Sequence, residues 1–210
     1  MWTEDQCLRR VVVFGSAVLY WTGVWAQARR VRKHTGRSPN VRPRGTKEIL
    51  LWSGWMVVVL LWLALPFLAR SDTPVPGLGL VTLLLRPLTL VSGVAMIFAG
   101  YAGTLWCYVA MGDAWRMGVN RAETTSLVTR GPYRLVRHPI YLFQIVILLG
   151  VALLLPTVLS LVIVGLHLLC VLVKASDEES YLLTAHSQTY SDYVASTGKL
   201  LPRRARRKAG

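Results

Sequence analysis

Long apolar runs separated by short charged stretches make up most of this chain. A helix that crosses a bilayer needs about 20 apolar residues, because each residue advances it by about 1.5 Å. Five runs reach or approach that length, at residues 11–27, 49–69, 88–111, 140–155 and 157–173. The pattern therefore predicts an all-α integral membrane protein with about five transmembrane helices.

Pro156 separates the last two runs, and both are slightly short for a span. Proline interrupts a helix because it lacks a backbone N–H and its ring clashes with the preceding turn. We therefore expect these two runs to form a tight C-terminal helical hairpin.

The chain reads as a single membrane domain over residues 1–210, with neither an internal repeat nor a soluble domain. Three spans fill residues 1–111, and a basic tail occupies 203–210. The core between them, 112–202, holds a loop, the hairpin and then an amphipathic helix. Helical spacing indicates that last helix, since one face collects Glu179, Leu182, Leu183, His186, Tyr190, Tyr193 and Val194.

Composition agrees with a membrane protein, since 53% of residues are hydrophobic and only 16% are charged. Soluble domains carry nearer to a quarter charged residues. A net charge of +14 is also typical of nucleic-acid-binding proteins. Here, however, the basic residues flank apolar runs, where anionic head groups favour them. We expect membrane lipids as partners, no nucleic acid and no obligate protein partner.

The distribution of Lys and Arg predicts the orientation of the spans. Five spans put 20 of the 24 basic residues on one face and 4 on the other. Because basic residues accumulate on the cytoplasmic side, the N-terminus is expected outside and the C-terminus in the cytoplasm.

The three cysteines, Cys7, Cys107 and Cys170, are scattered and lack the spacing of a metal or disulfide framework. We therefore expect no metal site.

Candidate chemistry begins just before the fourth run. Gly131-Pro132 indicates a turn, and Pro139 suits the first position of a helix. Arg134, Arg137 and His138 then gather at a helix N-terminus, whose dipole adds to their positive charge. Simple lipid anchoring would explain the arginines singly, but charged clusters at membrane depth are expensive and usually functional. This segment therefore predicts an anion site on the cytoplasmic face.

Acidic residues follow the fifth run, and the hairpin returns them to the same face as Arg137 and His138. Glu178 and Glu179 are adjacent, so on a helix they point about 100° apart. We expect one to bind a ligand and the other to cap a helix or face basic residues; Glu179 shares the inward face with Leu182. Cationic and acidic ends with tyrosines between them suit a zwitterionic ligand that carries a ribose.

The run Tyr133-Arg134-Leu135-Val136-Arg137-His138-Pro139-Ile140-Tyr141, followed by Glu178-Glu179 after one hairpin, resembles the isoprenylcysteine carboxyl methyltransferase family. That family shares this core with membrane phospholipid N-methyltransferases. Residues 111–116 and 127–129 resemble its bacterial branch, and the resemblance covers roughly 111–202.

The resemblance implies S-adenosylmethionine as cofactor, held between the start of the fourth helix and the segment after the hairpin. It implies methyl transfer to a lipid-like acceptor, with the carboxylate of an isoprenylated cysteine as one candidate. Arg137, His138 and Glu179 are the candidate catalytic residues. The candidate cofactor-binding residues are Val128, Gly131, Tyr133, Arg134, Arg137, His138, Pro139, Tyr141, Glu178 and Glu179.

Two alternatives stay open. A phospholipid amine N-methyltransferase would use the same core on an amine head group, with His186 or a glutamate as a general base. A membrane sterol-type reductase is more distantly similar, but it would use NADPH and more than five spans.

Overall fold

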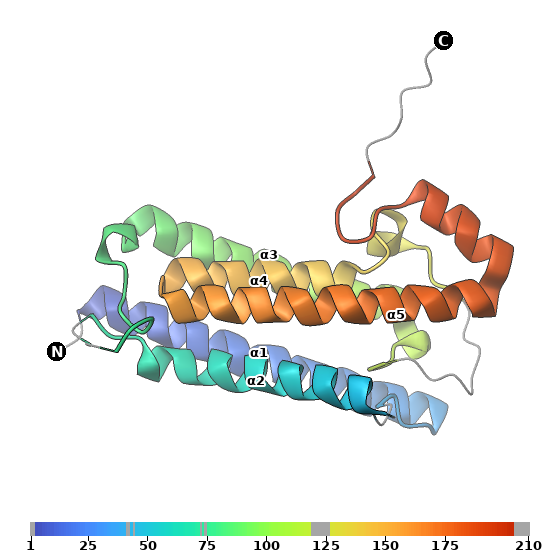
Figure 1. The fold of residues 1–210 in the computed structure, drawn as a ribbon, viewed down its shortest axis with the longest axis horizontal. Coiled ribbons are helices and arrows are strands. Elements are labelled where there is room, and N and C mark those ends of the chain that lie inside the picture. The colour runs from blue at the N-terminus through green and yellow to red at the C-terminus, as the bar shows by residue number, and fades with distance from the viewer. Residues whose placement is uncertain are drawn as a thin grey trace, which may run out of the picture.

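The computed structural model describes residues 3–40, 43, 45–71, 73, 75–118 and 127–203. Its five main helices lie along one long axis, with α1 and α2 side by side next to a layer of α3, α4 and α5 (Figure 1). Their bounds are Glu4–Thr35 (α1), Thr46–Leu68 (α2), Pro87–Met111 (α3), Pro139–Leu154 (α4) and Val158–Ser196 (α5). Within the described residues, the connections contain three 3-10 turns: Thr82–Leu84 (η1), Gly112–Ala114 (η2) and Gly131–Arg134 (η3).

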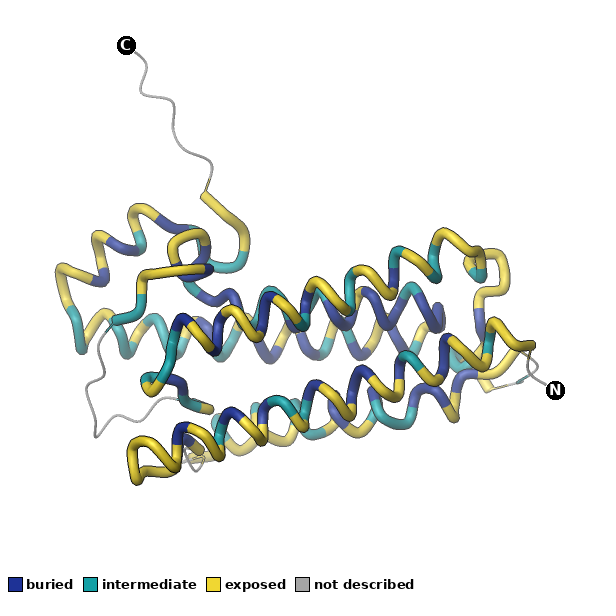
Figure 2. The backbone as a smooth tube through the Cα atoms, turned by 180° about the vertical axis from the view of Figure 1, so that it is seen from behind, coloured by how far each residue is buried: buried dark blue, intermediate teal, exposed yellow. Residues whose placement is uncertain are grey.

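The predicted all-α membrane fold is confirmed. Four helices, α1, α2, α3 and α5, are long and apolar enough to cross a bilayer, and α4 is a shorter apolar helix of 16 residues. Exposed and buried positions alternate along the helices (Figure 2). Many exposed positions carry large apolar side chains, such as Leu88, Phe98 and Val109 of α3. Such a surface suits lipid rather than water.

The expected hairpin is present, with α4 ending at Leu154 and α5 beginning at Val158. Thr157 caps α5, because its hydroxyl accepts from the Ser160 amide at 3.0 Å and the Ser160 hydroxyl accepts from the Thr157 amide at 3.2 Å. This reciprocal pair satisfies two amides that the first helical turn leaves open.

The expected amphipathic helix after the hairpin does not begin at Glu179. The fifth helix runs on from Val158 through both glutamates to a kink at Ser187, whose φ of 42° and ψ of −113° are not helical, and a second helical stretch continues to Ser196. Glu178 and Glu179 therefore lie in the interior of a helix rather than at the start of one. The first helix also extends beyond its apolar run at both ends, because polar residues continue it from the Thr3 cap to Gly36.

Glycines let α3 and α4 approach closely. A Cβ atom at Gly100 would lie 2.5 Å from Ile147 Cγ1 and 2.7 Å from the Phe143 carbonyl oxygen. On the facing helix, a Cβ at Gly150 would lie 2.7 Å from the Gly93 carbonyl oxygen. Small residues commonly allow such contact between membrane helices. This close contact between α3 and α4 fixes the position of α4, whose N-terminus carries the candidate site.

Gly100→Val is expected to lower the free energy of unfolding by about 1–3 kcal/mol, because the added methyl groups have no space between α3 and α4. Gly15→Val is a matched control, since no heavy atom lies within 4 Å of a Cβ there. Thermal unfolding of both variants in the same detergent measures the difference. Equal losses of stability in the two variants would mean that the contact between α3 and α4 does not depend on glycine.

Candidate active site

Glu179 of α5 is surrounded by basic side chains. Arg137 Nε donates to its Oε1 at 2.7 Å, and His138 Nε2 lies 3.2 Å from the same oxygen. Lys199 Nζ lies 3.2 Å from Oε2. The Arg137 and Glu179 side chains are only 10% and 16% exposed, so this network is mostly shielded from water.

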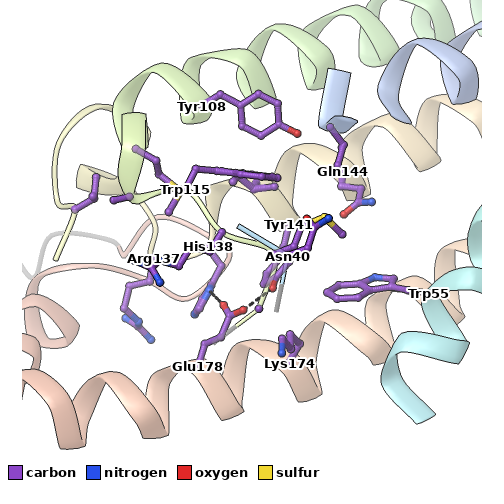
Figure 3. A pocket seen from close by; sticks show the side chains of 18 of the residues that line it. Asn40, Trp55, Tyr108, Trp115, Arg137, His138, Tyr141, Gln144, Lys174 and Glu178 are labelled. Atoms are coloured by element: carbon purple, nitrogen blue, oxygen red, sulfur yellow. Dashed lines mark hydrogen bonds and ion pairs between the residues drawn. The ribbon is translucent and has the colours of Figure 1, made fainter. Parts of the chain in front are cut away.

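Glu178 has different partners. The Tyr141 hydroxyl donates to its Oε1 at 2.8 Å, and His138 Nδ1 lies 3.4 Å from its Oε2. The imidazole of His138 thus bridges both carboxylates. Figure 3 shows Glu178 held between His138 and Tyr141 at the edge of a cavity.

A short segment after α5 holds the start of α4 in place. The Arg137 amide donates to the Gly198 carbonyl at 2.9 Å, and the His138 amide donates to the Lys199 carbonyl at 3.1 Å. Val136 and Gly198 accordingly form an isolated parallel bridge. Arg137 Nη1 also donates to the Thr197 carbonyl at 2.5 Å. Residues 197–199, hereafter the C-terminal strap, are part of the site, which the sequence did not indicate.

The cavity measures about 590 Å³, which is typical of a small-molecule site. It lies between Glu178, with its partners His138 and Tyr141, and the helix pair α1–α2. Polar side chains line one part of it, including His138, Glu178 and Lys174. Aromatic side chains line much of the rest: Tyr20, Trp21, Trp52, Trp55, Tyr108, Trp115, Tyr133, Tyr141, Tyr190 and Tyr193.

Six of the ten candidate cofactor-binding residues line this cavity: Val128, Tyr133, Arg137, His138, Tyr141 and Glu178. The other four lie elsewhere. Arg134 is exposed, and Pro139 is the buried first residue of α4. Gly131 adopts a φ of 61° against Trp106 and Ala110, so it shapes the turn. Glu179 contacts the basic cluster instead of the cavity.

These positions lie within the part of the chain that resembles a known family. Residues 88–189 match the family model of phospholipid methyltransferases. The matched segment contains α3, α4, the hairpin and both glutamates. The expected resemblance to the superfamily that the phospholipid and isoprenylcysteine enzymes share is therefore confirmed over this segment, which is just under half of the chain. The isoprenylcysteine carboxyl branch stays a prediction.

A curated relative is the nickel-cobalt-cadmium resistance protein NccN of Alcaligenes xylosoxydans xylosoxydans. It is 27% identical over 101 residues, which is 48% of this chain and 44% of the relative. The chain thus spans less than half the length of that relative.

Two residues of the cavity wall carry polar atoms without a hydrogen-bond partner among the described residues. The atoms are the Tyr190 hydroxyl and the Trp21 indole N–H, and both are buried. A buried polar group without a partner costs about 1–3 kcal/mol. Both atoms have almost no accessible surface, so they lie behind the cavity wall and not in the open cavity.

The environment of His138 favours its charged form. Burial opposes the charge, but the carboxylates of Glu178 and Glu179 outweigh that effect and raise the pKa of His138 above its ordinary value of 6.5. Burial lowers the pKa of an imidazole but raises that of a phenol. It raises the pKa of nearby Tyr133, which therefore keeps its proton. The protonated imidazole can then donate to both glutamates at once.

His138 should make stability depend on pH. A raised pKa in the folded state adds stability that is complete below the unfolded pKa and is lost as the pH rises through the folded pKa. We expect the thermal unfolding midpoint of the wild type to fall over that range, from pH 6.5 upward. In His138→Gln the unfolding midpoint should not show this fall with pH. In His34→Gln, which changes an exposed site on α1, it should fall as in the wild type. Parallel curves for all three proteins would contradict the assignment.

Proposed function

We propose that this protein is an S-adenosylmethionine-dependent methyltransferase that acts on a lipid-like acceptor at the membrane. One observation carries the proposal. His138, at the start of α4, and Glu178, on α5, form an ion pair and line the same cavity. Both residues lie within the segment that matches the phospholipid methyltransferase family. An isoprenylated carboxylate is the first acceptor class we propose, following the resemblance in the Tyr133–Tyr141 motif.

The residues present can hold each polar part of the cofactor, which supplies a methyl group activated by a sulfonium centre. The N-terminus of α4 suits its carboxylate, and His138 holds Glu178 beside it. Glu178, oriented by Tyr141, suits its ammonium or the ribose hydroxyls. Arg137 acts differently, because it spans Glu179 and the C-terminal strap and so keeps this wall of the site rigid.

The helix pair α1–α2 supplies a wall suited to an apolar acceptor. Leu51, Trp52 and Met56 of α2 line the cavity, as do Trp21 and Val24 of α1. Methyl transfer depends mainly on the alignment of nucleophile and methyl group. An aromatic, water-poor wall favours that alignment for a lipid-like molecule.

Binding of labelled S-adenosylmethionine to the purified protein in lipid nanodiscs tests the proposal, with labelled NADPH as the comparison. We expect saturable binding of S-adenosylmethionine that NADPH does not displace. Binding of NADPH alone would favour the reductase class. Repeating the assay with sealed vesicles tests the proposed cytoplasmic side, since only inside-out vesicles should bind the cofactor.

A further inference from the structure

Gln144 of α4 is a polar side chain with no partner in an apolar run. It is 7% exposed, lines the cavity and forms no hydrogen bond with any described residue. Figure 3 shows its amide directed into the cavity. A ligand that fills the cavity would exclude water from this amide, which is costly unless the ligand supplies hydrogen bonds of its own. Its position therefore points to a hydrogen-bonding group on a ligand.

Lys174 of α5 is a cation at the same depth. It also lines the cavity and has neither an ion pair nor a hydrogen bond within the described part of the chain. The bond between Tyr141 and Glu178 sets the register of the antiparallel pair α4–α5. Gln144 follows Tyr141 by three residues and Lys174 precedes Glu178 by four, so both lie about one helical turn deeper in the bundle.

Lys174 shares the cavity wall with two carboxylates, Glu48 and Glu178, and no ion pair among the described residues joins it to either. Glu178 is already bonded to Tyr141 and ion-paired with His138. At the depth of Lys174 the neighbouring wall is aromatic, since Trp55 of α2 packs on Tyr141 with ring centroids 5.8 Å apart. An ammonium head group placed there would meet Lys174 directly and be repelled.

We infer that Gln144 and Lys174 form an acceptor subsite that selects a carboxylate head group over an amine. The inference rests on the proposed function. Lysine supplies a charge-assisted hydrogen bond and the amide N–H a second donor, and one carboxylate accepts both. A carboxylate oxygen gains the methyl group as the bond from that carbon to sulfur breaks. The products are a neutral ester and a neutral thioether, so no proton has to leave.

The test compares two acceptors in nanodiscs with labelled S-adenosylmethionine: the carboxylate N-acetyl-S-farnesylcysteine and the amine phosphatidylethanolamine. We expect the wild type to methylate the carboxylate. Lys174→Met should raise KM for this acceptor at least about tenfold, the usual size of a charge-assisted contact, and Lys174→Arg should restore most of the loss. Gln144→Leu should raise it several-fold. The Kd for S-adenosylmethionine should stay unchanged in all of these variants.

Two controls match the substitutions. Lys33→Met removes an exposed cation of α1 that lies outside the cavity, and Gln27→Leu removes a glutamine that is 6% exposed and also lies outside it. Neither should change KM. Preference of the wild type for phosphatidylethanolamine would overturn the inference without any variant. Weaker S-adenosylmethionine binding by Lys174→Met would overturn it too, since the lysine would then hold the cofactor. A wild type that binds no S-adenosylmethionine would overturn the proposed function as well.

Discussion

Glu178→Gln is expected to lower methyl transfer by about ten- to a hundredfold with little loss of stability. Glu178 lines the cavity, and glutamine keeps its shape and can still accept from Tyr141. The charge is lost together with the ion pair to His138, which keeps Glu179 as a partner. Hydrogen bonds to charged groups contribute about 1.5–3 kcal/mol. Steady-state kinetics with the methyl acceptor, together with thermal unfolding, measures both quantities.

Glu179→Gln is the matched comparison. It should lower stability and leave methyl transfer close to that of the wild type. Glu179 faces Arg137, His138 and Lys199 but not the cavity. Removing one partner of a fully buried ion pair costs about 3–5 kcal/mol. The Lys199 side chain is 31% exposed, so partial solvation should reduce the loss here to about 2–3 kcal/mol. Full activity in both variants would remove the acidic half of the proposed site.

The helical hairpin and the polar cluster could be predicted because their signals are local. Pro156 marks the turn, and the order of Arg137, His138 and Pro139 marks a charged helix start. The choice between Glu178 and Glu179 could not be made in this way. Adjacent residues differ by about 100° on a helix, and which one faces the cavity depends on the register of α4 against α5. That register is seen in the bond from Tyr141 to Glu178 and in the contacts of His138 with both glutamates.

Features that depend on distant backbone contacts left no periodic signal. The C-terminal strap pairs with residues 136–138 through single bonds rather than a strand, so no alternating pattern precedes it. The continuation of α5 past residue 173 was missed because its apolar pattern ends there while its helical backbone does not. Gln144 lies within an apolar run, so the sequence pattern did not single it out. Its meaning appears only when the cavity is known.

Arg137→Ala should produce the second large effect, on stability and on cofactor affinity together. Arg137 bonds to Glu179 and to the Thr197 carbonyl, so its loss leaves a mostly buried carboxylate with fewer cations and frees the C-terminal strap. Removing one partner of a buried pair costs about 3–5 kcal/mol. Because His138 is tied to the same strap, we expect affinity for S-adenosylmethionine to fall at least about tenfold.

Arg134→Ala provides the comparison within the same motif. The sequence assigned both arginines to the cofactor site, but Arg134 is exposed and does not line the cavity. Its removal should leave both cofactor affinity and the unfolding midpoint close to those of the wild type. Arg137→Lys separates charge from geometry, because an ammonium cannot reproduce the fork by which one guanidinium reaches two partners. This variant should remain well below the wild type in both measurements. Equal behaviour of the Arg134 and Arg137 variants would instead make both residues lipid head-group anchors, and the basic half of the site would then rest on His138 and the N-terminus of α4.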